Sequence, residues 1–214
     1  TRNGLSRFDG HRFVTYGTEH GLPTPVINYL LETRGGVYWV ATNGGGVCRV
    51  NPDAGARDCG SLFTIYPVGE GIYSNRVNCL YEDRAGQLWA GTDDGLFRLE
   101  ETNGRMAFRL TEVVKPSSFG RRVSVESLMG GRDGSLWITA DSRLSRLLPD
   151  GGVIHYTIQS THGADGVSSL LEDREGEIWV GSTNGLFRFR PEPSSGGARV
   201  SRTLVARRQP PFSE

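Results

Sequence analysis

The sequence predicts an all-β fold, a β-propeller made of four-stranded antiparallel blades, and three observations support this. First, one stretch recurs four times and ends each time at a Trp, which accounts for all four Trp of the 214-residue chain: Trp39, Trp89, Trp137 and Trp179. Second, these Trp lie 50, 48 and 42 positions apart, a period typical of propeller blades. Third, 30 Gly and 10 Pro with 36% hydrophobic residues are typical of a turn-rich β protein.

Each repeat is predicted to form three strands separated by two tight turns, with a fourth strand after a variable connection. In the second copy, residues 77–82 are a β-rich run, residues 83–86 supply the first turn, and residues 92–95 supply the second. Asp or Asn early in a turn can bond its own backbone, and Gly accepts the positive φ at the end. The third copy lacks the Gly of the second turn, which predicts a different turn near residue 141. The fourth strands are expected at residues 63–66, 108–110 and 153–156.

The propeller segment is predicted to cover residues 1–190, with blades that start near residues 27, 77, 125 and 167. Residues 3–16 are predicted as two orphan outer strands, because residues 3–8 match residues 184–189 and residues 13–16 match residues 63–66. Residues 191–214 are predicted as a linker and tail, with a weakly indicated last strand near residues 200–205. We expect an incomplete segment, of about four to five blades, of a larger propeller. The alternative is a closed four-bladed ring in which residues 13–16 complete the last blade.

Charge and hydropathy exclude several classes of partner. The formal net charge is zero, so no global field attracts nucleic acid or an anionic membrane surface. No apolar run approaches the roughly 20 residues of a membrane-spanning helix, so no membrane span is predicted in this segment. The first residues do not resemble a secretory signal and read as the middle of a repeat. We therefore expect the sequence to be a piece of a longer protein.

The three Cys are too few for a disulfide scaffold. Cys48 and Cys59 flank a predicted hairpin loop, residues 51–58, and could face each other across it. A cross-strand disulfide and two unpaired, half-buried thiols both remain open for this pair. Cys79 lies in an apolar strand and is expected in the core.

The recurring polar residues are better explained by structure than by catalysis. Asp83 and Asp173 stand at the start of regular turns, beside Glu82 and Glu172, whereas a catalytic carboxylate pair is expected only once. An Arg that recurs in the third strand, as Arg98 does, is expected to lie over the neighbouring blade and to bind a carboxylate or carbonyl. The four Trp are expected between blades in the core. The four His lie in different repeats without metal spacing, so neither a metal nor another cofactor is predicted.

Ligand contacts are instead expected on the loops, which differ between the repeats while the strands do not. The loops that enter the inner strand, and those that join the second strand to the third, gather on one propeller face around the axis. Concave sites form there. We predict ligand-binding residues in the entering loops and in the joining turns: Tyr73, Asn75, Arg76 and His162, and Asn43, Asp93, Asp94 and Asn184.

Residues 80–98 and 171–188 carry a resemblance to a known family. Both contain Glu-Asp-Arg-x-Gly, a Trp three residues after this Gly, and an acidic or amide residue followed by Gly-Leu-Phe-Arg. They resemble the two-component-regulator propeller repeats, and the likeness covers roughly residues 3–190. The resemblance implies a non-catalytic, ligand-sensing propeller segment of a bacterial signalling receptor, in the periplasm or outside the cell. It implies a small-molecule or glycan ligand, and, as partners, the remaining blades and an output domain of the full-length receptor.

Two other functions remain open from the sequence. One is a hydrolase or lyase on a propeller scaffold, which would require acidic or His side chains to converge at the axis with perturbed pKa values. The other is a pure protein-interaction module. An incomplete propeller would also leave unpaired strand edges, so we expect this segment alone to associate, with a homodimer as one outcome.

Overall fold

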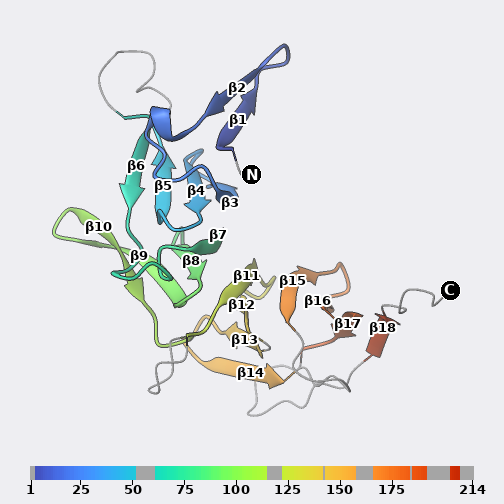
Figure 1. Ribbon diagram of the computed structural model, residues 1–214. Helices are drawn as coiled ribbons and strands as arrows, with labels where there is room; N and C mark the ends of the chain where they lie inside the picture. The colour runs from blue at the N-terminus through green and yellow to red at the C-terminus, as the bar shows by residue number, and fades with distance from the viewer. Residues whose placement is uncertain are drawn as a thin grey trace. The chain divides into compact units, whose positions relative to one another are not determined.

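A computed structural model describes residues 3–51, 61–114, 122–141, 143–157, 166–183, 185–191 and 203–207. These residues form an all-β structure with four four-stranded antiparallel sheets and one two-stranded sheet, which confirms the predicted propeller blades (Figure 1). The strands of each blade lie side by side in sequence order, so each blade is a simple meander. The chain divides into two compact units, Thr1–Val125 and Glu126–Glu214, and each is described by itself.

The first unit contains the two-stranded sheet and the first two blades. The two-stranded sheet pairs β1 (Leu5–Phe8) with β2 (Phe13–Tyr16), and a short 3-10 helix η1 (Thr18–His20) follows it. The strands of blade one are β3 (Ile27–Glu32), β4 (Tyr38–Thr42), β5 (Val47–Val50) and β6 (Phe63–Tyr66). The strands of blade two are β7 (Val77–Glu82), β8 (Leu88–Thr92), β9 (Gly95–Thr102) and β10 (Arg105–Leu110).

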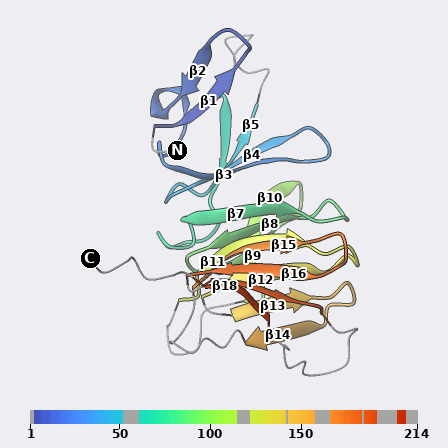
Figure 2. The same cartoon turned by 90° about the vertical axis from the view of Figure 1, so that its right-hand side faces the viewer.

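The second unit contains blades three and four (Figure 2). The strands of blade three are β11 (Val125–Gly130), whose first residue ends the first unit, β12 (Leu136–Ala140), β13 (Arg143–Leu147) and β14 (Val153–Thr157). The strands of blade four are β15 (Val167–Glu172), β16 (Ile178–Ser182), β17 (Gly185–Phe189) and β18 (Thr203–Arg207).

Strand β18 lies within the stretch that we predicted as linker and tail. It pairs with β17 and is the fourth strand of blade four, where the sequence only weakly indicated a strand. Residues 13–16 do not take this place, because β2 pairs with β1. Residues 5–8 and 13–16 thus form a two-stranded sheet of their own, and the alternative in which residues 13–16 complete the last blade is wrong.

The first turn of each blade has the predicted backbone. The Gly three residues before the Trp has a positive φ in all four copies: 73° at Gly36, 83° at Gly86, 87° at Gly134 and 79° at Gly176. The second turn of blade three lacks a Gly, and Asp141 there takes a φ of 50°, which a non-Gly residue adopts only occasionally. The predicted irregularity of this turn is confirmed.

Two of the Trp residues, Trp39 and Trp137, lie in cores between blades, whereas Trp179 is only half-buried. In the first unit, Trp39 of blade one shares a core cluster with Val77 and Leu80 of blade two. In the second unit, Trp137 of blade three packs 5.9 Å, between ring centroids, from Phe189 of blade four. Each of these cores therefore joins two consecutive blades through the large aromatic residue of the repeat, as predicted.

The two-stranded sheet packs against blade one. Leu5 and Tyr16 contact a cluster that contains Ile27, Val40 and Phe63. The far end of the same sheet is open to solvent: Phe8 is 55% exposed and Phe13 is 71% exposed, with ring centroids 4.7 Å apart.

The two described Cys residues are both buried. Cys79 is buried in the core, as predicted. Cys48 is fully buried, and this burial raises the pKa of its thiol to about 12. Cys48 is a free thiol in the structure, so the cross-strand disulfide alternative is wrong, and its expected partner, Cys59, lies outside the described residues.

Candidate functional site

The turn carboxylates of blades two and four bind their own blade. One oxygen of Asp83 accepts hydrogen bonds from the backbone N–H groups of Ala85 and Gln87, both at 2.9 Å. The other oxygen accepts a bond from the indole Nε1–H of Trp89 at 2.9 Å. Asp173 repeats this arrangement in blade four, and the bond from Trp179, at 2.6 Å, lowers the pKa of its carboxyl. These carboxylates are fully used by the turn and the core Trp, so the structural interpretation is confirmed.

Blades one and three close the same turn with other residues. Blade one has Thr33 at this position, and its hydroxyl exchanges hydrogen bonds of 3.1 Å with the backbone of Val37. Blade three has Gly131 there, and Asp133 two residues later accepts bonds from the backbone and hydroxyl of Ser135. Burial would raise the pKa of Asp133, but the hydrogen bonds from Ser135 and Arg146 outweigh it and lower the pKa to about 2.

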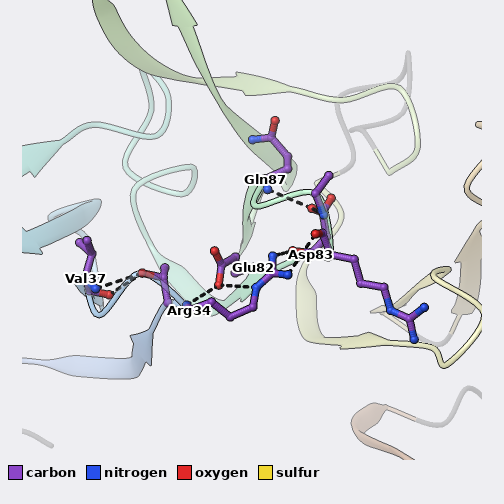
Figure 3. A network of polar contacts seen from close by, with 8 residues as sticks. Arg34, Val37, Glu82, Asp83 and Gln87 are labelled. Atoms are coloured by element: carbon purple, nitrogen blue, oxygen red, sulfur yellow. Dashed lines mark hydrogen bonds and ion pairs between the residues drawn. The ribbon is translucent and has the colours of Figure 1, made fainter.

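A second recurring contact ties consecutive blades together at these turns (Figure 3). In the first unit, the backbone N–H of Arg34 donates to Oε2 of Glu82 in the next blade at 2.8 Å, and its Nε lies 3.4 Å from the same oxygen. The Arg34 guanidinium also donates to the carbonyls of Asp83 and Arg84. In the second unit, Arg132 binds Glu172 of the next blade in the same way, at 2.8 Å. The recurring Arg and Glu are therefore inter-blade clasps.

The Arg of the third strand lies over the Trp of its own blade. The guanidinium carbon lies 5.9 Å from the ring centroid for Arg98 over Trp89, and 5.4 Å for Arg188 over Trp179. Our prediction that this Arg covers the neighbouring blade is wrong, because antiparallel register places it directly opposite the Trp of the adjacent strand. The predicted carboxylate partners are confirmed: Arg98 binds Glu100 at 2.5 Å and Arg188 binds Glu177 at 3.2 Å.

The loop that enters blade two is held by the side-chain amide of Asn75. Its Oδ1 accepts the backbone N–H of Val68 at 2.9 Å, and its Nδ2 donates to the carbonyls of Gly69 and Gly71 at 2.8 and 2.9 Å. Ser74 adds a hydroxyl bond of 2.8 Å to the same Gly71 carbonyl. We predicted Asn75 as a ligand contact, and the structure shows its amide engaged in shaping the loop.

This loop places Tyr73 beside two guanidinium groups. The guanidinium carbon of Arg76 lies 5.1 Å from the Tyr73 ring centroid, and that of Arg122 lies 3.4 Å from it. Tyr73 is half-buried and Arg122 is exposed. The structure thus joins two predicted contacts, Tyr73 and Arg76, to a third residue that was not among them.

Asp93 closes one side of this cluster. Its Oδ1 accepts hydrogen bonds from Asn78 at 3.0 Å and from the hydroxyl of Ser124 at 3.3 Å, and its Oδ2 lies 3.8 Å from Nη1 of Arg76. The backbone N–H of Asp93 also donates to the carbonyl of Arg76 at 3.1 Å. Asp93 therefore positions Arg76 and the start of the next inner strand. Its neighbour Asp94 is half-buried and lies in the same joining turn.

Of the remaining three residues that we predicted as ligand contacts, the structure describes only Asn43. Asn43 forms an isolated backbone bridge with Arg76, which brings the joining turn of blade one beside the loop that enters blade two. The backbone carbonyl of Asn75 strengthens this junction by accepting the N–H groups of Gly44 and Gly46, both at 3.0 Å. His162 and Asn184 lie outside the described residues.

Sequence reasoning missed two features of this face. Asn28 and Asn78 occupy the same repeat position, and each donates to a backbone carbonyl of the next inner strand, Val77 at 2.9 Å and Val125 at 3.2 Å. Their shared position was a usable signal. Arg122 lay in a loop expected on this face, but no spacing indicated that it would stack on Tyr73.

The described part of the chain holds no group of three His, Cys, Asp or Glu side chains arranged to bind a metal. None of its helices is long and apolar enough to cross a membrane. The described carboxylates whose pKa values are shifted, Asp9, Asp133 and Asp173, accept bonds from their own turns and, for Asp133 and Asp173, from an adjacent strand of the same blade. The loop cluster therefore presents the ring of Tyr73 with the guanidinium groups of Arg76 and Arg122 over it. Asp93 balances the charge of Arg76.

Comparison with known proteins supports the resemblance read from the repeats. The family described as two component regulator propeller matches residues 74–94 and 163–184, so the chain carries repeats of this family, as predicted. A search of curated proteins gives no significant match.

Solved structures share the fold at low sequence identity. An extracellular domain of a one component system from B. thetaiotaomicron is 24% identical with a TM-score of 0.67, over 86% of this chain and 24% of that chain. An extracellular domain of a hybrid two component system from the same organism is 18% identical with a TM-score of 0.65, over 95% and 26%. Virginiamycin B lyase from Staphylococcus aureus is 15% identical with a TM-score of 0.67, over 95% and 64%. The present chain thus spans about a quarter of the two extracellular domains.

Proposed function

We propose that this chain, which carries two-component regulator propeller repeats, is a non-catalytic, ligand-sensing segment of a two-component-type signalling receptor. The family match and the likeness to extracellular domains of such systems support this proposal. They also support a periplasmic or extracellular location. The proposed ligand is a small molecule or a glycan, and the partners are the further blades and the output domain of the receptor.

The observation that carries the proposal is that the recurring polar residues serve the scaffold, whereas a loop specific to one blade presents an aromatic side chain. Those that recur from blade to blade are engaged in turns and inter-blade clasps, as Asp83 and Arg34 are. The sequence of residues 70–76 is not repeated in the other entering loops, and the bonds of Asn75 hold this loop and present Tyr73 at its surface. Binding groups are expected on such blade-specific loops, because the scaffold beneath them is fixed.

Signal transfer requires that the ligand binds two states of the receptor with different affinities. The loop of residues 70–76 connects blade one to blade two, and its last residue, Arg76, bonds to the joining turns of both blades through Asn43 and Asp93. A ligand at Tyr73 would therefore act on the packing of one blade against the next. We propose this junction as the place where binding is converted into a change of propeller geometry.

A ligand screen on the full chain tests the proposal. Binding of neutral and charged mono- and oligosaccharides is measured by thermal shift and by calorimetry, with the wild type, Tyr73→Ala and the control Tyr29→Ala. Tyr29 is an exposed Tyr on β3. We expect at least one saccharide to stabilise the wild type and the control but not Tyr73→Ala. Ligands that stabilise all three proteins equally, or hydrolysis or elimination of a saccharide at a catalytic rate, would contradict the proposal.

The rival function, a hydrolase or lyase, draws on the shared fold with propeller enzymes such as virginiamycin B lyase. At 15% identity this likeness carries no activity to the present chain. A pure protein-interaction module would use the same face, and it would differ in that a protein rather than a saccharide protects Tyr73.

A further inference from the structure

We propose that Tyr73, Arg76 and Arg122 form a binding site for an oxyanion group, a carboxylate or a phosphate, carried by the ligand. This inference rests on the proposed sensing function and names the ligand chemistry of the same face. It comes from the charges around Tyr73 and from a comparison with the other stacked Arg residues of the chain.

The contact between Arg122 and Tyr73 places the guanidinium over the aromatic ring. At 3.4 Å from the ring centroid, the guanidinium carbon is at stacking distance from the aromatic face. A stacked guanidinium keeps its N–H groups in its own plane, directed away from the ring. This edge is the one that accepts a carboxylate or phosphate through two parallel hydrogen bonds.

The other stacked Arg residues show what such an edge binds in this protein. Three Arg of the third strands lie over a Trp, and each forms an ion pair with a carboxylate of its own blade: Arg98 with Glu100, Arg146 with Asp133 and Arg188 with Glu177. Arg122 also lies over an aromatic ring, at the shorter distance of 3.4 Å, and it forms no ion pair with a carboxylate of the described residues. The oxyanion of the ligand would take the place that Glu or Asp takes in the other three stacks.

The charges of the cluster also favour an anionic ligand group. Arg76 and Arg122 bring two positive charges to one Tyr ring, and the carboxylate of Asp93 lies near Arg76. One oxygen of Asp93 is already held by Asn78 and Ser124, and the other lies 3.8 Å from Arg76. Among the described residues, one positive charge, that of Arg122, has no carboxylate paired with it at this half-buried aromatic surface, and an anionic group would balance it.

The site is also ordered before the ligand arrives. Asn75 and Ser74 hold the backbone on both sides of Tyr73 through four bonds of 2.8 to 2.9 Å. Because the ring is fixed, less conformational freedom is lost when an anion binds to the guanidinium groups stacked around it.

Three probes with the same sugar ring separate the oxyanion from the rest of a ligand. D-glucuronate supplies a carboxylate, D-glucose 6-phosphate supplies a phosphate, and D-glucose supplies neither. Binding to the full chain is measured by NMR titration of backbone amides in the wild type, in Arg122→Gln and in Arg105→Gln. Arg105 is an exposed Arg on β10, away from this loop, and is the matched control.

We expect at least one of the two anions to shift the amide signals of residues 70–76 in the wild type and in Arg105→Gln, with D-glucose having no comparable effect. Arg122→Gln should weaken the anion about tenfold or more, the scale of a charge-assisted hydrogen-bond pair. The affinity should also fall as salt is raised, because the site is exposed. Which anion binds more tightly identifies the oxyanion.

Two results would overturn the inference. One is equal binding of D-glucose and the anions, unaffected by Arg122→Gln, which leaves the sensing function intact with a neutral ligand. The other is the absence of any shift at residues 70–76 with either anion. If the saccharide screen with Tyr73→Ala succeeds in that case, only the oxyanion is wrong. If that screen fails as well, the proposed function fails with it.

Discussion

Replacing Asp83 by Ala removes one carboxylate that satisfies three donors at once. Two of them, the backbone N–H groups of Ala85 and Gln87, lie in a turn that water can reach, and losing each bond costs about 0.5–1 kcal/mol. The third donor is the indole N–H of Trp89, whose side chain is 6% exposed. A buried donor left without an acceptor costs about 1–3 kcal/mol. We therefore expect Asp83→Ala to lower the free energy of unfolding by about 3 kcal/mol.

Urea unfolding followed by Trp fluorescence measures this loss, and two further variants separate its parts. Asp83→Asn keeps an oxygen for the turn N–H groups but presents an amide NH₂ to the indole, so we expect about half the effect. Asp94→Ala, in the second turn of the same blade, is the matched control and should stay within about 0.5 kcal/mol of the wild type. The reasoning is refuted if Asp83→Ala and Asp94→Ala unfold at the same urea concentration.

Three other predictions follow from the contacts described above. In a double-mutant cycle of Arg34→Gln and Glu82→Gln, we expect a coupling energy of about 0.5–1 kcal/mol that shrinks at high salt, and zero coupling at low salt would contradict the clasp. The pKa of Asp133 is about 2 in the folded protein against an ordinary value of 3.8, so its carboxylate stabilises the fold above about pH 4. This contribution is lost as the pH falls towards 2, and the acid unfolding curve of Asp133→Asn should be flatter over that range. Finally, among the described strands β1 pairs on one side, with β2, so we expect the 214-residue chain to associate in solution. Light scattering coupled to gel filtration measures this, and a monodisperse monomer would contradict it.

The sequence alone determined the blades and their turns because both depend on local patterns. A Trp at a fixed distance from a Gly of positive φ specifies one strand, one turn and the next strand, as around Gly86 and Trp89. Four copies of that pattern made the propeller fold predictable. The roles of the turn carboxylates were predictable for the same reason, since Asp83 bonds residues only two to six positions away.

Only the tertiary structure decided which distant residues meet. Arg34 and Glu82 are 48 positions apart, and Tyr73 and Arg122 come from two loops whose sequences share no pattern. The sequence placed Tyr73 and Arg76 on the ligand face, but it did not show that Asn75 is consumed by its own loop or that Arg122 stacks on the ring. Strand register and turn chemistry are written into neighbouring residues, whereas the contacts of irregular loops depend on how the scaffold brings them together in space.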